Sequence, residues 1–401
     1  MTSQKSEIVV AGTGPAGMIA ALGLAHAGFA VTLLGPEPRR DDRRTTALMS
    51  PALRYLETLG VLAEITEHAA PLSVMRIVDA TARLVRSPTV TFRASEIGED
   101  FFGLNMPNDV LFSALEAALS ARAIDWRQSP VTEWQVGDTS VTARLADGSE
   151  VEAPLAVAAD GRDSLARQAA DIATSTRSYP QSALVLNFGH SRGHGSISTE
   201  FHTETGPFTQ VPLPGNRSSL VWVVKPETAE ELAGLDDAAL SVQVEQKMQS
   251  MLGRVAVEPG RQIYPLSTLL PARFAKRRIA LVGEAAHVFP PIGAQGLNLG
   301  IRDVEDIVRT AGEYRDDPGS AAALSLYDRR RRPDILARST AVNLLNVSLL
   351  SDMLPAQLAR SAGLGVLGAL SPLRAFFMRE GMQPGSGFAR AFSSLREQVR
   401  R

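Results

Sequence analysis

The chain has 401 residues, a formal net charge of −2, 44% hydrophobic residues and no cysteine. This length and composition predict a well-packed protein of two or three domains. Disulfide bonds, thiol catalysis and cysteine metal sites are excluded, and the six histidines lack the spacing of a metal site. We expect no metal ion and no nucleic-acid partner.

The first predicted elements are a strand at residues 8–11, a helix at 18–27 and a second strand at 30–34. In the GTGPAG turn, Gly12 suits a sharp turn, Gly14 the close approach of a pyrophosphate, and Gly17 tight helix packing. Glycines in an ordinary strand-to-helix turn can mimic this motif. Between two apolar runs it predicts dinucleotide binding, and it leaves the identity of the dinucleotide open.

A second strand-to-turn unit lies in the middle of the chain. Residues 155–159 are apolar, and Asp160 and Gly161 follow them. Ser164 is placed to cap the helix that comes next. By itself, an Asp-Gly pair indicates only a turn.

A third unit begins with a short apolar strand at residues 279–282. From Gly283 to Asp303 the chain runs through a Pro/Gly loop into a helical pattern. The backbone amides of residues 296–298 are expected to be unpaired at the helix N-terminus, where they favour negative charge. Taken alone, this unit could be an ordinary turn between a strand and a helix, with no role in binding.

In their order and form, the three motifs resemble those of the single-component flavoprotein hydroxylases typified by the hydroxybenzoate enzymes. Within that group the chain is most similar to the ubiquinone-biosynthesis hydroxylases. The narrower resemblance is carried by residues 42–48, 59–61, 105–108, 327–333, 343–346 and 372–378. It therefore covers nearly the whole chain.

The interleaved motifs predict an α/β fold with a discontinuous, Rossmann-like FAD-binding domain at residues 1–73, 105–172 and 275–325. The strand-rich segments 74–104 and 173–274 predict a mostly antiparallel β-sheet substrate domain. Residues 326–401 are predicted to form a helical C-terminal region that is interrupted by Pro333, Pro355 and Pro372.

The resemblance also implies which residues contact FAD. The pyrophosphate would rest on the first glycine turn with further hydrogen bonds from an arginine and an asparagine, while the other two motifs would contact the rest of the cofactor. The residues assigned in this way are Gly12, Gly14, Ala16, Gly17, Arg44, Asn108, Asp160, Gly161, Gly283, Glu284, Pro291, Gly296, Leu297 and Asn298. No side chain is assigned as catalytic, and His287 is expected to be structural.

The activity that the resemblance implies is hydroxylation of an aromatic ring. NAD(P)H or an external reductase would reduce the flavin, and dioxygen would then form a flavin hydroperoxide that transfers oxygen to a prenylated phenol of ubiquinone biosynthesis. Val211, Leu213 and Trp222 are candidates to line the substrate pocket, with ordinary sheet core as the alternative.

Two other functions remain open at this point. One is a flavin hydroxylase acting on a small soluble aromatic compound or a secondary metabolite. The other is a non-catalytic flavin-binding subunit of a biosynthetic complex.

Three positions depart from the family pattern. Gly35 stands where an acidic residue usually bonds the adenosine ribose, with Glu37 two residues later. Glu284 replaces the usual Asp, which adds a methylene group in a site expected to be crowded. The small residues Gly293 and Ala294 follow the order of the hydroxybenzoate enzymes.

Charge is unevenly distributed, since residues 326–401 hold 12 Arg against 5 Asp and Glu. Apolar stretches at 341–350 and 362–370 are too short to span a bilayer, and no secretion signal is recognised, so we expect a cytoplasmic protein. The basic tail is expected to pack on the protein. The alternative is peripheral contact with anionic lipid at the inner membrane face.

Overall fold

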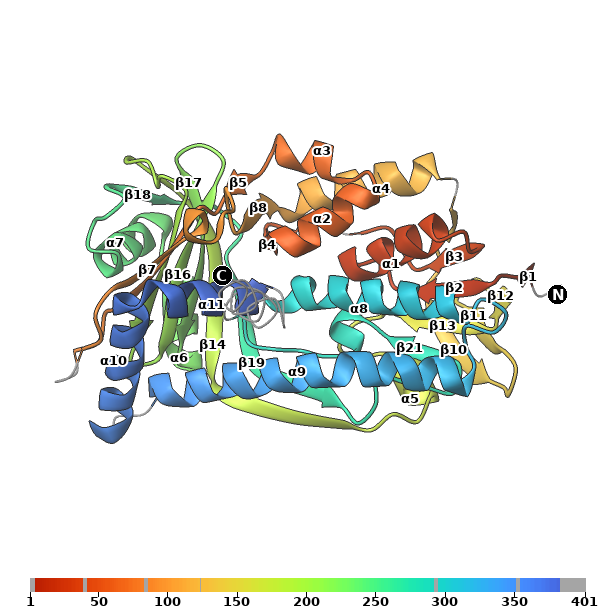
Figure 1. The fold of residues 1–401 in the computed structure, drawn as a ribbon. Coiled ribbons are helices and arrows are strands. Elements are labelled where there is room, and N and C mark those ends of the chain that lie inside the picture. Colours follow the sequence, from red (N-terminus) through yellow and green to blue (C-terminus); the bar gives the residue numbers. More distant parts are fainter. Residues whose placement is uncertain are drawn as a thin grey trace.

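A computed structural model describes residues 4–38, 42–82, 86–122, 124–291, 295–350 and 354–382. One of its two large sheets, in the right-hand half of Figure 1, has six strands in the order β20-β21-β13-β2-β3-β9. The strands are β2 (Ile8–Ala11), β3 (Val31–Leu34), β9 (Asp125–Arg127), β13 (Leu155–Ala158), β20 (Ala275–Lys276) and β21 (Ile279–Leu281). All but the β20–β21 pair are parallel, and β2, β3, β13 and β21 are buried along their whole length, which explains why their sequences are apolar except for Thr32.

Helices α1 (Pro15–His26) and α8 (Gln295–Glu313) pack against each other beside this sheet, and α4 (Asn108–Ala121) packs on α1. Smaller elements surround them: α2 (Ser50–Thr58), α3 (Leu62–Thr66), α5 (Leu165–Ala169) and the three-stranded sheet of β4 (Thr45–Met49), β8 (Gly103–Pro107) and β5 (Ala70–Pro71). A separate sheet of β1 (Gln4–Lys5), β12 (Glu150–Ala153), β11 (Val141–Leu145) and β10 (Val131–Val136) was not anticipated from the sequence.

The second large sheet is mostly antiparallel. Its order is β18-β14-β17-β16-β15-β6-β7, with β19 paired to β14, and only β15 and β6 run parallel. Its strands are β6 (Val74–Asp79), β7 (Val90–Arg93), β14 (Thr174–His190), β15 (Ile197–Thr203), β16 (Gly206–Leu213), β17 (Arg217–Val224), β18 (Val255–Val257) and β19 (Gln262–Pro271). Helices α6 (Pro226–Gly234) and α7 (Asp237–Lys247) cover one face of this sheet. The two large sheets and the helices that pack on them confirm the predicted mixed α/β architecture.

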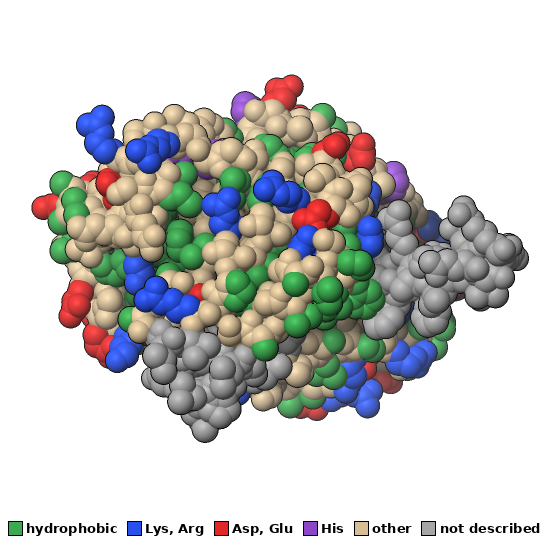
Figure 2. Space-filling view, turned by 60° about the vertical axis from the view of Figure 1, so that its left-hand side comes forward, with side chains coloured by type: hydrophobic (Ala, Val, Ile, Leu, Met, Phe, Trp, Pro, Cys, Tyr) green, Lys and Arg blue, Asp and Glu red, His purple; other side chains and the backbone are tan. Residues whose placement is uncertain are grey.

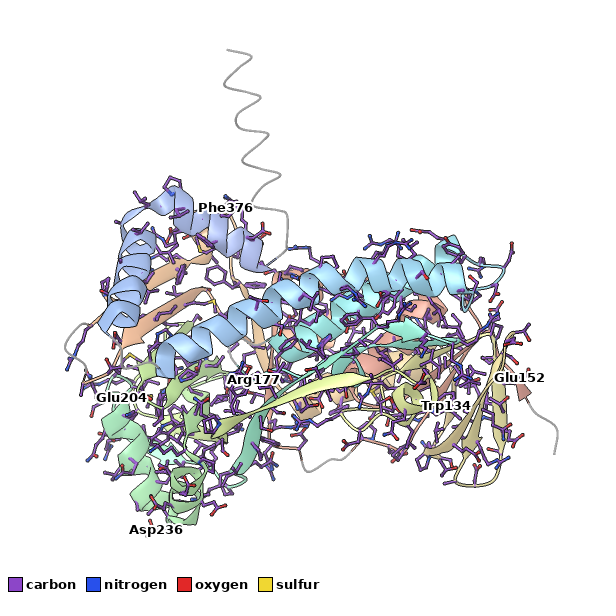
Figure 3. The ribbon with its side chains drawn as sticks, turned by 90° about the horizontal axis from the view of Figure 1, so that it is seen from below. Trp134, Glu152, Arg177, Glu204, Asp236 and Phe376 are labelled. Atoms are coloured by element: carbon purple, nitrogen blue, oxygen red, sulfur yellow. The ribbon has the colours of Figure 1, made fainter. Side chains whose placement is uncertain are left out.

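A long ribbon joins the two regions. Strand β14 has 17 residues, and its part from Thr174, opposite Pro271, to Val185, opposite Gln262, pairs with β19. The register shifts once, between Ser178 and Ser182. Figure 3 shows β14 extending through the middle of the molecule, where Arg177 is labelled.

The C-terminal region is helical as predicted, with α9 (Ala321–Leu350), α10 (Leu354–Ala369) and α11 (Ser371–Met382). The prediction that Pro333 interrupts it was wrong, because Pro333 lies inside α9. Proline removes one helical hydrogen bond, but the ion pairs of Arg331 and Arg338 with Asp334 hold the chain on both sides of it. Among the described residues no single helix could cross a bilayer. Residues 361–369 and α11 reach that length and composition only as a pair bent by 106°.

A buried charge network fixes α8 against α9. Asp303 on α8 is fully buried, and its carboxylate accepts hydrogen bonds from the Gly283 amide at 3.0 Å and from Arg331 Nε on α9 at 2.7 Å. His287 Nε2 lies 2.7 Å from the same carboxylate. Burial alone would raise the pKa of Asp303, but His287 and Arg331 hold it below its usual value. Asp303 is therefore a carboxylate that depends on its partners to remain charged.

We predict that Asp303→Asn lowers the free energy of unfolding by about 3 kcal/mol at pH 7, because it leaves the buried Arg331 with weaker partners. The pKa of Asp303 is lowered in the folded state, so its contribution is complete above the unfolded pKa of about 4 and is lost as the pH falls through the folded pKa. Urea unfolding at pH 7 and in steps toward acid would measure this. The exposed Asp316→Asn is the control, and a difference between wild type and Asp303→Asn that persists unchanged in acid would contradict the prediction.

Candidate functional site

The glycine turn between β2 and α1 is packed too tightly for side chains at two positions. Gly12 has a φ of +110°, and a Cβ there would lie 2.1 Å from the carbonyl oxygen of Ala159. A Cβ on Gly17 would lie 1.9 Å from the carbonyl oxygen of Gly12. These glycines bring α1, β2 and the end of β13 into contact, as close helix-strand packing requires.

Gly14 differs from its neighbours. It precedes α1 with an ordinary φ of −70°, and a Cβ there would meet nothing within 4 Å. Neither backbone conformation nor protein packing therefore requires glycine at this position. The open space lies at a helix N-terminus, where unpaired amides attract anions.

The turn before α8 comes close to the same helix. A Cβ on Gly283 would lie 2.9 Å from Ala16 Cβ, and one on Gly300 would lie 3.2 Å from Gly283 Cα. The η2 turn (Gly283–Ala285) is thus held between α1 and α8. The structure brings the first and third motifs into direct contact.

Asp160 supplies an unsatisfied polar atom. One carboxylate oxygen accepts a hydrogen bond from the Ala166 amide of α5 at 3.1 Å, while the other, Oδ1, is buried without a partner. Burial raises the pKa of Asp160. Gly161 follows with a φ of +83°, and the predicted cap by Ser164 is confirmed by its bond from the Arg167 amide. A ligand hydroxyl would satisfy Oδ1.

Helix α8 begins at Gln295, so the first turn that holds Gly296, Leu297 and Asn298 carries the partial positive charge of a helix N-terminus. The Asn298 side chain holds this end against β4, since it donates to Ala47 O and accepts from the Met49 amide, both at 2.8 Å. Gly296 is exposed, and so is Pro291 at the end of the preceding segment. Gly293 and Ala294 lie outside the described residues.

Arg44 and Asn108 share a partner that the sequence did not reveal. The guanidinium of Arg44 donates two hydrogen bonds of 2.8 Å to Asp42, and Asn108 Nδ2 donates another of 2.8 Å. Burial would raise the pKa of Asp42, but these donors lower it, and the same ion pair raises the pKa of Arg44. An anion receptor is therefore present, and the chain's own carboxylate is bound to it.

Several contacts join this receptor to the large sheet. Arg44 lies 5.9 Å from the ring centre of Tyr264 on β19, and Asn187 on β14 donates to the carbonyl oxygen of Arg43 at 2.9 Å. Asn105 on β8 donates to Pro212 O at 2.8 Å. Glu284 is exposed near Arg44.

The face of the large sheet that carries these contacts, called the valine face below, has no charged side chain at its central positions on β14, β17 and β16, while Glu200 and Arg217 lie at its margins. Val185 and Val221 are opposite each other, Val211 is opposite Ser219, and all three valines are half-buried. Leu213 lies on the same face and is fully buried. Trp222 points to the other face, where it packs on Phe208 beneath α6 and α7, so its assignment to a substrate pocket was wrong.

The structure explains Gly35. Its φ is +143°, and a Cβ there would lie 3.0 Å from Thr13 Cγ2, so an acidic residue would be strained. Glu37 is exposed and accepts a hydrogen bond from Gln128 at 2.9 Å. No group of residues that could hold a metal ion occurs in the described part of the chain.

Sequence reasoning assigned no role to Asp42, Tyr264 or Asp303. The Asp-x-Arg spacing of residues 42–44 is a usable signal for Asp42, because a carboxylate two residues before an arginine can bond both its amide and its guanidinium. Tyr264 carried no signal, since its contact with Arg44 depends on how the sheet packs. Asp303 ends the third motif and could have been paired with a buried cation.

Comparisons with known proteins agree with this geometry. The family described as "FAD binding domain" matches residues 5–339. The chain is 32% identical to "Ubiquinone hydroxylase UbiL" of Rhodospirillum rubrum, over 94% of this chain and 89% of that protein. It is 29% identical to "3-demethoxyubiquinol 3-hydroxylase" of Escherichia coli, over 91% of this chain and 95% of that protein.

Among solved structures, p-nitrophenol 4-monooxygenase PnpA of Pseudomonas putida has the same fold. It matches with a TM-score of 0.75 at 20% identity and covers 96% of this chain and 98% of its own. The family match spans most of the chain, including all three glycine motifs. The protein therefore belongs to the FAD binding domain family, and it is an FAD-dependent aromatic monooxygenase.

Proposed function

We propose that the protein hydroxylates the ring of a neutral, prenylated phenol in the biosynthesis of a ubiquinone-type quinone. The named activities of its relatives support this pathway. The single structural observation that carries the proposal is the valine face of the large sheet, which has no charge at its central positions and lies on the side of Arg44 and β8.

That face has a chemical consequence for the substrate. Its nine central positions on β14, β17 and β16 hold no charged side chain: Ala183, Val185, Asn187, Ser219, Val221, Val223, Thr209, Val211 and Leu213. A benzoate would bring a carboxylate that needs a cation or several donors when desolvated. A phenol with an apolar substituent has no such requirement, which favours it over a small aromatic acid.

The glycine turn at the start of α1 and the carboxylate of Asp160 form a site that we call the cradle. The residues of the cradle fit FAD. Gly12, Gly14, Ala16 and Gly17 would hold the diphosphate at the start of α1, and Asp160 Oδ1 would accept a cofactor hydroxyl. When bound, FAD supplies electron transfer from NAD(P)H and the activation of dioxygen. The chain's task is to bind, orient and desolvate the reacting groups.

Two features would tune the cofactor. The first-turn amides of α8 present partial positive charge, which stabilises negative charge on a reduced ring system, and Asn298 keeps that helix end in place against β4. Arg44 and Asn108 would pair with the diphosphate after releasing Asp42. We also propose that the protein works with other enzymes of the pathway and contacts the membrane that holds their products.

We predict that Gly14→Val folds normally but binds FAD at least about tenfold more weakly, because the new side chain fills only the space of the ligand. Thermal melting and the FAD content of the purified variant would measure the two effects. Gly17→Val is the contrasting variant and should lose the fold, since its Cβ would collide with Gly12 O. A Gly14→Val protein with full FAD content would refute this placement of the diphosphate.

The activity can be tested with purified holoenzyme, NADH or NADPH, and isotopically labelled dioxygen. We expect one labelled oxygen atom in a phenol that bears a short prenyl chain. We also expect kcat/KM at least about tenfold above that for the corresponding hydroxybenzoate, because the central positions of the valine face offer the benzoate's charge no cation. Product masses and steady-state rates decide the outcome. Faster turnover of the benzoate would overturn the substrate assignment and favour a small aromatic acid.

A charged side chain on the valine face should weaken binding of the prenylated phenol. We predict that Val221→Asp raises KM for the prenylated phenol by about tenfold or more, through the cost of burying a carboxylate beside an apolar ring. The matched control is Val242→Asp, since Val242 is 51% exposed on α7 and lies away from this face. Equal KM values in the two variants would show that the face does not contact the substrate.

A further inference from the structure

The helices α10 and α11 form an apolar corner, defined here as residues 361–382. Seven large hydrophobic side chains are exposed among the described residues, and three of them lie on this corner: Val366 at 46%, Leu370 at 51% and Phe377 at 51%. Figure 2 turns this side of the molecule forward and shows hydrophobic side chains gathered on it. Exposed apolar groups that cluster in this way mark an interaction surface.

The corner has a defined shape because its inner side is anchored. Arg374 donates to Glu96 at 2.8 Å and to the carbonyl oxygens of Leu367 and Gly368 at 3.1 and 2.8 Å, which ties the end of α10 to α11 and to the substrate domain. Met378 is buried against the short helix η1 (Ala94–Ile97). Figure 3 shows the two helices meeting at an angle at one end of the molecule, with Phe376 on α11. The exposed side chains are therefore held outward on a fixed frame.

Composition and charge together indicate what the corner contacts. Residues 361–369 and α11 have the length and apolarity of a membrane span, but they are bent by 106° and cannot cross as one helix. Helices α10 and α11 contain three arginines and one glutamate, and of these arginines Arg374 is paired with Glu96 on the inner side of the corner. Residues 326–401 as a whole carry a net charge of +7, although Arg331 and Arg338 on α9 are paired with carboxylates. Apolar helices in a basic setting suit the interface of an anionic bilayer.

We propose that the apolar corner docks on the surface of an anionic lipid bilayer, with Val366, Leu370 and Phe377 inserted at the boundary between headgroups and acyl chains. The helices then lie in the membrane surface. The basic C-terminal region adds electrostatic attraction to the apolar contact.

The same corner touches the site through a cluster of flexible side chains. Met378 and Met382 of α11 pack with Met49, Met75 and Phe92 in one hydrophobic cluster. The amide of Met49 is the one bound by Asn298 at the start of α8. Methionine adapts to irregular apolar partners. If the proposed function holds, this cluster leads the prenyl chain of a membrane-held substrate toward the cradle.

The docking is tested by sedimentation of the full-length holoenzyme with vesicles of phosphatidylglycerol and phosphatidylethanolamine, compared with vesicles of phosphatidylcholine alone. We expect binding to the anionic vesicles and at least about tenfold weaker binding for Leu370→Glu combined with Phe377→Glu, because two apolar anchors become charged. Val242→Glu, on α7, is the matched control and should bind like wild type. FAD content and thermal melting of all variants check that they fold.

Absence of vesicle binding by the wild type would overturn the proposal, and so would unchanged binding by the double variant. A wild type that instead forms a dimer, which the double variant disrupts without any vesicle binding, would assign the corner to a second copy of the chain. Hydroxylation of a soluble, short-chain phenol without vesicles should be equal in wild type and double variant. Failure of that reaction in both would count against the proposed function and leave the docking result standing.

Discussion

The carboxylate of Asp303 holds together the backbone segments on which the site depends. It lies on α8, accepts the Gly283 amide of the turn after β21, and pairs with Arg331 of α9. Close packing imposes the same arrangement, since Gly283 sits between Ala16 of α1 and Gly300 of α8 with no room for a side chain. Charge and steric fit therefore fix the position of the α8 N-terminus relative to that of α1. A side chain as small as a methyl group at Gly283 or Gly300 would push α1 and α8 apart.

Those two helix ends and Arg44 make the cradle electropositive, and the chain balances part of this charge itself. Asp42 occupies the donors of Arg44 and Asn108, while Asp160 presents a buried oxygen without a partner. The cradle thus contains both an anion receptor and an acceptor for a hydroxyl group. A dinucleotide carries both kinds of group, whereas a simple phosphate carries only the first. The proposed placement of FAD uses both kinds of group, whereas a small anion would use only one.

Local spacing made much of the molecule predictable from the sequence. The glycine turn, the Ser164 cap and the apolar strands depend on residues within a few positions of one another, and the discontinuous order of motifs indicated the α/β architecture. Pairings between distant segments were not predictable in this way. Asn108 reaches Asp42 across 66 residues, and Trp222 faces α6 and α7 because those helices cover that side of the sheet. Pro333 was misjudged because α9 continues through it, which local spacing alone did not indicate.

The β14–β19 ribbon has a mechanical consequence. A strand of 17 residues extends about 55 Å, and its residues take part in the large sheet at one end and reach toward the FAD-binding region at the other. Two hydrogen-bonded strands resist bending far more than a single connecting loop. The register shift between Ser178 and Ser182 is the one irregularity in this pairing, so we expect the ribbon to bend mainly at this point. Any rocking of the substrate sheet over the cradle would bend the ribbon there, directly beside Ala183 at the edge of the valine face.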